Sequence, residues 1–133
     1  MKHWPFLLTA AASLAVVPVM AGHAQEQNAL KALMLKKLES SQKVLEGLAL
    51  SDFERIGKHA EELVRISKTA DFRVLKTPQY EIYSNDFRRG ADALVMMAEG
   101  KNLDGAALAY VELTLTCVKC HKHVRETRMA RAD

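Results

Sequence analysis

Two cysteines and a histidine near the end of the chain form the pattern with the clearest chemistry. They lie in Cys117-Val118-Lys119-Cys120-His121, which is the C-x-x-C-H motif of c-type haem attachment sites. Cysteines three positions apart share one face of a helix, so their sulfurs can bond the two vinyl groups on one edge of a haem. The imidazole of His121 can then turn to the iron. The motif therefore predicts one covalently bound haem c with His121 as an axial ligand.

Three other uses of these residues stay open at this point. A thiol redox pair shares the C-x-x-C spacing, but it belongs near a strand–helix junction, and no strand pattern is present here. A zinc site needs about four ligands, so His59 or His123 would have to complete the set. A Cys117–Cys120 disulfide in a haem-free helical domain would leave His121 without a role. We favour haem attachment because it employs all three residues at this spacing.

The first 24 residues are organised like a secretory signal peptide. Lys2 gives a basic start, residues 6–21 are almost entirely apolar, and the small residues Gly22 and Ala24 precede a polar segment. The apolar run of about 16 residues is shorter than the roughly 20 that a membrane-spanning helix needs. We expect cleavage after Ala24, or else after Ala21, and a mature domain of residues 25–133 that lies outside the cytoplasm and is not embedded in the membrane.

Length and composition fit one small helical domain. Of 133 residues, 49% are hydrophobic, 26% are charged and 6% are aromatic. The six Gly and three Pro are too few for a collagen-like or low-complexity protein. The formal net charge is +3 and is expected to be spread along the chain, which argues against a nucleic-acid partner.

Apolar residues recur at helical spacing in four stretches, and no alternating strand pattern of useful length occurs. Four helices with short connections predict an all-α fold, an antiparallel four-helix bundle. Ser51 and Glu54 read as a capping box, Thr77-Pro78 as a helix start and Gly100 as a helix end. The expected helices span about residues 27–47, 51–69, 77–100 and 103–128, with core stripes at Leu30, Met34, Leu38 and Leu45, at Phe53, Ile56, Ala60, Leu63 and Ile66, at Tyr80, Tyr83, Phe87, Leu94 and Met97, and at Leu103, Ala106, Tyr110, Leu113, Cys117, Cys120 and Val124.

A C-x-x-C-H motif near the end of a fourth amphipathic helix, behind a signal peptide, resembles the cytochrome c′ family, the class II c-type cytochromes. The likeness covers nearly all of residues 25–133 in helix order and length, and the haem motif is its specific part. It implies a haem-bearing four-helix bundle in a bacterial periplasm, often a homodimer. Arg125, four residues after His121, matches a basic position that follows the motif in that family. Two roles for Arg125 stay open: a contact with a haem propionate, or a solvated position in the last turn, where its charge favours the helix dipole.

The residue on the other side of the iron separates two functions. In the low-spin relatives of cytochrome c′ a Met from the first helix ligates the iron, whereas in cytochromes c′ proper an apolar side chain closes that face. Met34 lies in the first predicted helix, so the resemblance implies Met34 as the second iron ligand. The alternative is that Met34 only fills the core. Weaker candidates for this position are Met96, Met97, Met129, His59, His123 and Lys31.

We therefore expect a periplasmic carrier of single electrons that works with redox partner proteins. No catalytic acid–base pair or nucleophile group stands out, so the chain is not expected to be an enzyme. If Met34 is only packing, the reduced iron has a free side for NO or CO, and gas binding is the alternative function. The charge pairs Lys36-Lys37 and Arg88-Arg89 are expected on solvated surfaces.

Overall fold

The computed structural model describes residues 18–69 and 72–130, with side chains from residue 24 onward. Four helices account for most of this chain: α1 (Pro18–Leu50), α2 (Phe53–Ser67), α3 (Pro78–Glu99) and α4 (Leu103–Met129). The described ranges contain no strand, so the predicted all-α class is confirmed.

Helix α1 is longer than the expected helix over residues 27–47: it begins at Pro18 and ends at Leu50. At its start it runs without a break through Ala24, the expected cleavage position. Residues 1–17, the greater part of the predicted signal peptide, lie outside the described residues. Within the described chain, none of the helices combines the length and the apolar character needed to cross a bilayer.

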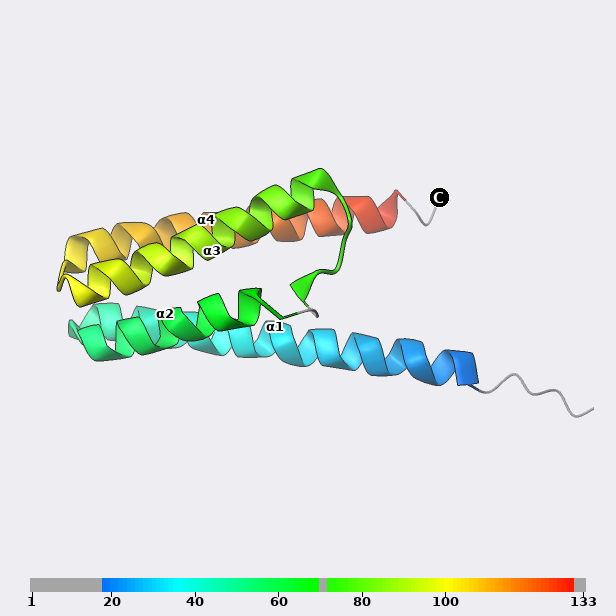
Figure 1. Cartoon of the computed structure of the whole chain (residues 1–133), viewed down its shortest axis with the longest axis horizontal. Coiled ribbons are helices and arrows are strands. Elements are labelled where there is room, and N and C mark those ends of the chain that lie inside the picture. Colours follow the sequence, from blue (N-terminus) through cyan, green and yellow to red (C-terminus); the bar gives the residue numbers. More distant parts are fainter. Residues whose placement is uncertain (1–17, 70–71, 131–133) are drawn as a thin grey trace, which may run out of the picture.

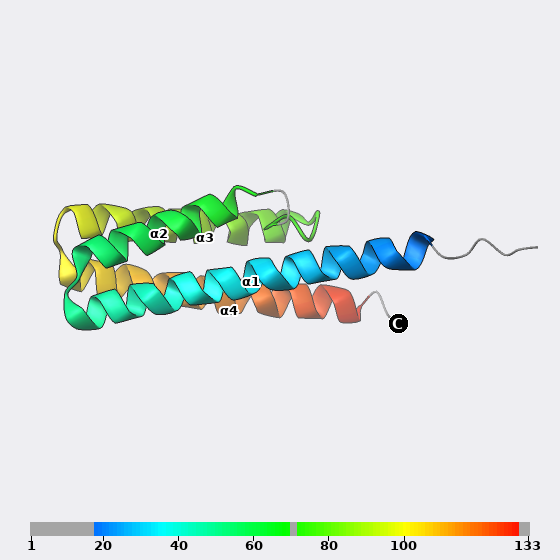
Figure 2. The same ribbon diagram turned by 90° about the horizontal axis from the view of Figure 1, so that it is seen from below.

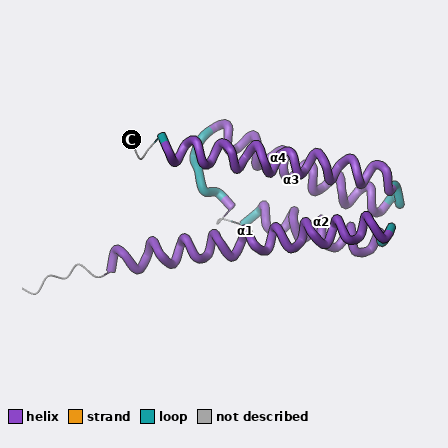
Figure 3. The backbone as a smooth tube through the Cα atoms, turned by 180° about the vertical axis from the view of Figure 1, so that it is seen from behind, coloured by secondary structure: helices purple, strands orange, loops and turns teal. Residues whose placement is uncertain are grey.

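The helices are arranged as two hairpins. Figures 1 and 2 show α1 running back along α2 and α3 running back along α4, so that consecutive helices point in opposite directions. Packing between the hairpins is dense between α2 and α3 and sparse between α1 and α4. The hairpins lie close together at the end with the two tight connections and diverge toward the other end, as Figures 1 and 3 show. The end of α4 with the C-x-x-C-H motif lies on the divergent side.

The connection between α1 and α2 differs from the predicted capping box by one residue. The N-cap of α2 is Asp52, whose carboxylate accepts a hydrogen bond from the backbone N–H of Arg55 at 3.0 Å. Ser51 has a φ of 54°, in the left-handed region, and therefore belongs to the turn. Asp and Ser are about equally good N-caps, so the sequence does not decide between adjacent candidates. The expected helix start at Thr77-Pro78 and the expected helix end at Gly100 are confirmed.

A close approach at Gly47 fixes the packing of α1 on α2. The first helix was expected to end near residue 47, but α1 continues through Gly47 to Leu50. A Cβ at Gly47 would lie 2.9 Å from Cγ1 of Ile56 and 3.1 Å from the carbonyl oxygen of Asp52. The absent side chain therefore lets the first turn of α2 pack directly against α1.

Substitution Gly47→Ala should destabilise the protein by about 1–3 kcal/mol, because α2 must shift to admit the new methyl group. The matched control is Gly57→Ala in α2, where the new Cβ would meet only the Cβ of Ala98 at 3.6 Å. That variant should be neutral or more stable by up to about 1 kcal/mol, since alanine favours a helix over glycine. Urea unfolding of both variants tests this, and equal stabilities would contradict it.

The core stripe expected for the first helix is wrong at two positions. Leu38 and Leu45 are 55% and 52% exposed, whereas Val44 is fully buried and Ser40 is 4% exposed. The physical reason is the uneven packing of α1, which rests on α2 and leaves the side toward α4 open. The stripes of the other helices are confirmed in their most buried members, which are Ile56, Ala60, Leu63 and Ile66 of α2, Tyr80, Phe87 and Leu94 of α3, and Ala106 and Leu113 of α4.

Candidate functional site

The divergent end of the two hairpins contains the main cavity of the site, with a volume of about 670 Å³ including its open mouth. The walls are mostly apolar or aromatic, and no Asp or Glu is among them. The residues that line it are Leu30, Met34 and Lys37 of α1, Phe72 and Val74 of the connection, Tyr80, Tyr83 and Phe87 of α3, and Thr116, Cys117, Cys120, His121, Val124 and Arg128 of α4.

The three residues of the motif all face this cavity, because the helical spacing of α4 puts them on adjoining positions of its inner side. Both cysteines are half-buried free thiols, and Cys117 also packs against the buried core. His121 is exposed, at the edge of the cavity. Two thiols and one imidazole thus line one apolar space.

The cavity sets the protonation of these groups. Burial raises the pKa of the Cys117 and Cys120 thiols, and the positive charge of Lys37 opposes that rise at both. Burial, followed by the charges of Lys37 and Arg125, lowers the pKa of His121. His121 is therefore neutral at physiological pH, and the neutral ring is the form that binds a metal.

Met34 lies on the α1 wall of the same cavity. It also lines an adjoining cavity of about 450 Å³. The two cavities have four further lining residues in common, which are Lys37, Phe87, Cys117 and His121. The sequence could not fix the rotation of α1, and the structure turns Met34 toward the motif on α4. A thioether and an imidazole, both soft or borderline donors, thus line one space from different helices.

Lys37 corrects an expectation, because it was placed on a solvated surface and instead lines both cavities. Its ammonium nitrogen lies 4.0 Å from the ring centroid of Phe87 and 4.5 Å from that of Phe72. These are cation–π contacts, and the described residues provide it with no ion pair. Burial lowers the pKa of Lys37, against the opposing effect of the two thiols.

Replacing Lys37 by Met should therefore stabilise the cofactor-free polypeptide by about 1 kcal/mol at neutral pH, because it removes a partly desolvated cation. The lysine pKa is lower in the folded protein than its ordinary value of 10.5. The unfolded chain therefore binds the proton of the Lys37 ammonium more tightly than the folded protein does. As the pH rises toward 10.5, the free energy of unfolding of the wild type therefore rises relative to that of Lys37→Met. Urea unfolding of both proteins between neutral pH and pH 10.5 measures the difference between their free energies of unfolding. This difference should become smaller as the pH rises, and an increase would contradict the prediction.

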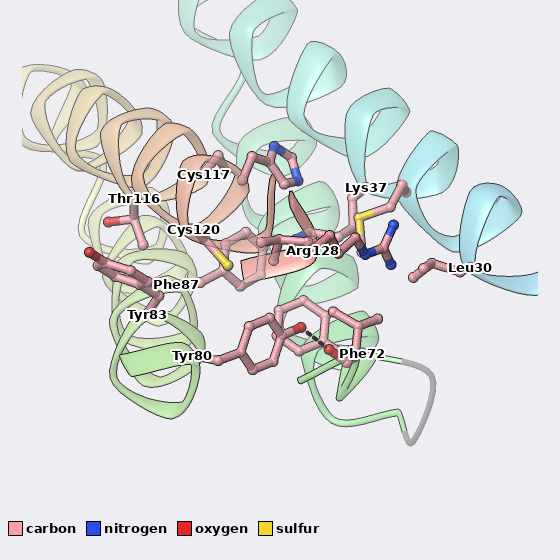
Figure 4. A pocket seen from close by; sticks show the side chains of 14 residues that line it. Leu30, Lys37, Phe72, Tyr80, Tyr83, Phe87, Thr116, Cys117, Cys120 and Arg128 are labelled. Carbon is pink, nitrogen blue, oxygen red and sulfur yellow. Dashed lines mark hydrogen bonds between the residues drawn. The ribbon is translucent and has the colours of Figure 1, made fainter. Parts of the chain in front are cut away.

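Aromatic side chains form the floor of the cavity opposite the helices that carry the donors. The Phe72 and Phe87 ring centroids are 5.6 Å apart, and the Tyr80 hydroxyl donates a hydrogen bond to the backbone oxygen of Phe72, as Figure 4 shows. This bond holds the segment after α2 against α3. The sequence pointed to Tyr80, Tyr83 and Phe87 as core residues, whereas Phe72 was missed because it lies in a connection without helical periodicity.

Of the two arginines near the end of α4, Arg128 lines the cavity and Arg125 does not. Arg125 is exposed, although its charge reaches His121. His123 points away from the cavity, and its Nε2 shares a 2.9 Å hydrogen bond with Oγ1 of Thr77, which ties α4 to the start of α3. Neither cavity is lined by the weaker ligand candidates Met96, Met97, Met129, His59 and Lys31.

Comparisons with protein-family models, with curated proteins and with solved structures found no match for this chain. Among the described residues, no three His, Cys, Asp or Glu side chains converge as a ready-made metal-ion site.

Proposed function

We propose that this protein is an exported mono-haem c-type cytochrome that carries single electrons in the periplasm. In this proposal thioether bonds from Cys117 and Cys120 hold one haem c, and His121 and Met34 are the axial ligands of its iron. The observation that carries the proposal is the placement of the C-x-x-C-H motif on an apolar, carboxylate-free cavity whose other wall presents a methionine. The resemblance of the sequence to the cytochrome c′ family supports the same function.

The residues that line the cavity fit a haem in their chemistry. An aromatic and aliphatic lining suits the face of a porphyrin, and two half-buried free thiols are available for its vinyl groups. A haem also carries two propionates, and the cavity wall provides two cations, Lys37 and Arg128, without competing carboxylates. The pairing of Lys37 with an anionic occupant would replace the contacts that its ammonium group makes with two rings.

When bound, the haem supplies the one-electron chemistry of its iron. The protein's contribution is to hold the ligands still and to exclude water. His121 and Met34 are fixed on two rigid helices, so neither has to rearrange when an electron arrives or leaves. Thioether ligation raises the reduction potential relative to a weaker ligand, and the apolar lining disfavours the more highly charged oxidised state. No step in this function requires a catalytic acid or base.

The proposal is tested by expressing the full chain in a bacterial host with the machinery for covalent haem attachment. We expect a coloured periplasmic protein whose pyridine haemochrome spectrum is of the c type and whose mass exceeds the mature polypeptide by one haem. Amino-terminal sequencing of the same material reports the cleavage position. A colourless product with the mass of the bare polypeptide, from a host that loads a known c-type cytochrome in parallel, would overturn the proposal.

A further inference from the structure

A group of exposed side chains on α4 lies directly outside the candidate haem site. Leu115 and Val118 are 53% and 58% exposed, and Lys119, Lys122 and Arg125 beside them are exposed as well. Their spacing of three, four and seven positions puts them on one outer face of the helix. We refer to these five residues as the α4 patch.

The charge of α4 is concentrated in this part of the helix. All four of its Lys and Arg residues lie in positions 119–128, and Glu126 is the one acidic residue there. This stretch carries a formal charge of +3, equal to the net charge of the whole chain. The expectation of an unclustered charge is therefore wrong. The opposite end of the molecule exposes both signs of charge: Glu54, Glu99 and Asp104 together with Lys58 and Lys101.

Stabilisation of the helix end does not account for this cluster. Cations favour the carboxyl end of a helix, but the effect is limited to the last turn. Helix α4 ends at Met129, so Lys119 and Lys122 lie more than one turn too early. Intrahelical pairing is also weak, since Lys122 and Glu126 are 3.9 Å apart and both are mostly exposed. Three of the four cations have no ion pair in the described chain.

Two exposed aliphatic side chains beside a row of three cations combine the apolar and the charged contacts that protein-binding surfaces use. Small interfaces of this kind serve transient redox encounters, in which electrostatic attraction raises the rate of association. Val118 lies between the two cysteines in the sequence, so the patch includes an exposed residue of the attachment motif itself. Because the rate of electron transfer falls steeply with distance, a docking surface close to the attachment motif is favoured.

We propose that the α4 patch is the docking surface for an acidic redox protein, to and from which the haem passes electrons. The inference rests on the proposed function, because the patch has this use only if a haem is attached beside it. The partner is defined by chemistry: a surface rich in Asp and Glu around a small apolar area, complementary to Lys119, Lys122 and Arg125.

The experiment uses the haem-loaded full protein and two small redox probes of opposite charge. Oxidation by hexacyanoferrate(III) and by tris(phenanthroline)cobalt(III) is followed by stopped-flow absorbance at low ionic strength. In the variant Lys119→Glu/Lys122→Glu, oxidation by the anionic probe should slow about tenfold, and oxidation by the cationic probe should accelerate. Both effects should fade at about 0.3 M salt, where charges are screened within several ångströms.

The matched control is Lys58→Glu/Lys101→Glu, which makes the same change in net charge with two exposed lysines near the tight connections. This variant should alter both rates much less than Lys119→Glu/Lys122→Glu does, since Lys101 precedes the start of α4 and Cys117 lies several turns further along that helix. If the two variants shift the rates equally, only net charge matters and the docking surface is overturned. A haemochrome assay on each protein separates this outcome from failure of the proposed function, in which no haem would be present to oxidise.

Discussion

Alanine at position 34 should convert the haem iron from low-spin to predominantly high-spin in the oxidised protein. Met34 is the methionine that lines the cavity from α1, and a methyl side chain cannot reach the iron. The reduction potential should fall with the loss of the thioether, and reduced Met34→Ala should bind CO rapidly at neutral pH. Absorption spectra of the oxidised, reduced and CO-treated protein measure all these effects together.

Leu30→Ala is the matched control for this variant. Leu30 lies on the same helix and lines the same cavity, but its side chain has no donor atom. The control should keep the wild-type spin state while losing some stability, as large-to-small substitutions do. An unchanged low-spin spectrum in Met34→Ala would exclude Met34 as the ligand. Rapid CO binding by the reduced wild type would instead favour the gas-binding alternative, with Met34 as packing.

The double variant Cys117→Ser/Cys120→Ser should lose covalent haem completely. Serine keeps the size and the helix of the motif but cannot form thioether bonds with the vinyl groups. Acid–acetone extraction should therefore remove all haem from the variant and none from the wild type. Mass spectrometry of the extracted polypeptides measures the difference directly.

Single cysteine variants supply the control for folding and maturation. Cys120→Ser leaves Cys117 as one attachment point, so a fraction of the protein should retain haem through a single bond. Its haemochrome band should then shift to longer wavelength, because one vinyl group stays unsaturated. Haem that resists extraction from the double variant would show that residues other than Cys117 and Cys120 hold it.

The fold class and the motif could be read from the sequence because both depend on local spacing. Periodicity alone predicts α2, α3 and α4, and the positions of Cys117, Cys120 and His121 on one helix side follow from helical geometry. The cluster of Lys and Arg residues in positions 119–128 is also a feature of the sequence, but the net charge of the whole chain does not reveal it.

The rotation of α1 was beyond the sequence because two apolar stripes compete on that helix. Leu38 and Leu45 lie on one face of α1 and are exposed, whereas Val44 lies on another face and is buried. Tertiary packing on α2 selects the second face, which turns Lys37 into the cavity. A lysine in a helix is expected at the surface, and only the apolar surroundings supplied by Phe72 and Phe87 from other elements change that.

The divergence of the two hairpins also bears on the order of assembly. The end with the tight connections is packed by protein side chains alone, so it can form before any cofactor arrives. At the other end, the two sulfurs stand on a completed helix while the space beside them is still open to the outside. If the proposed haem is attached, the folded polypeptide would present Cys117 and Cys120 at a fixed spacing to the attachment machinery. The porphyrin would then complete the packing of this end of the protein.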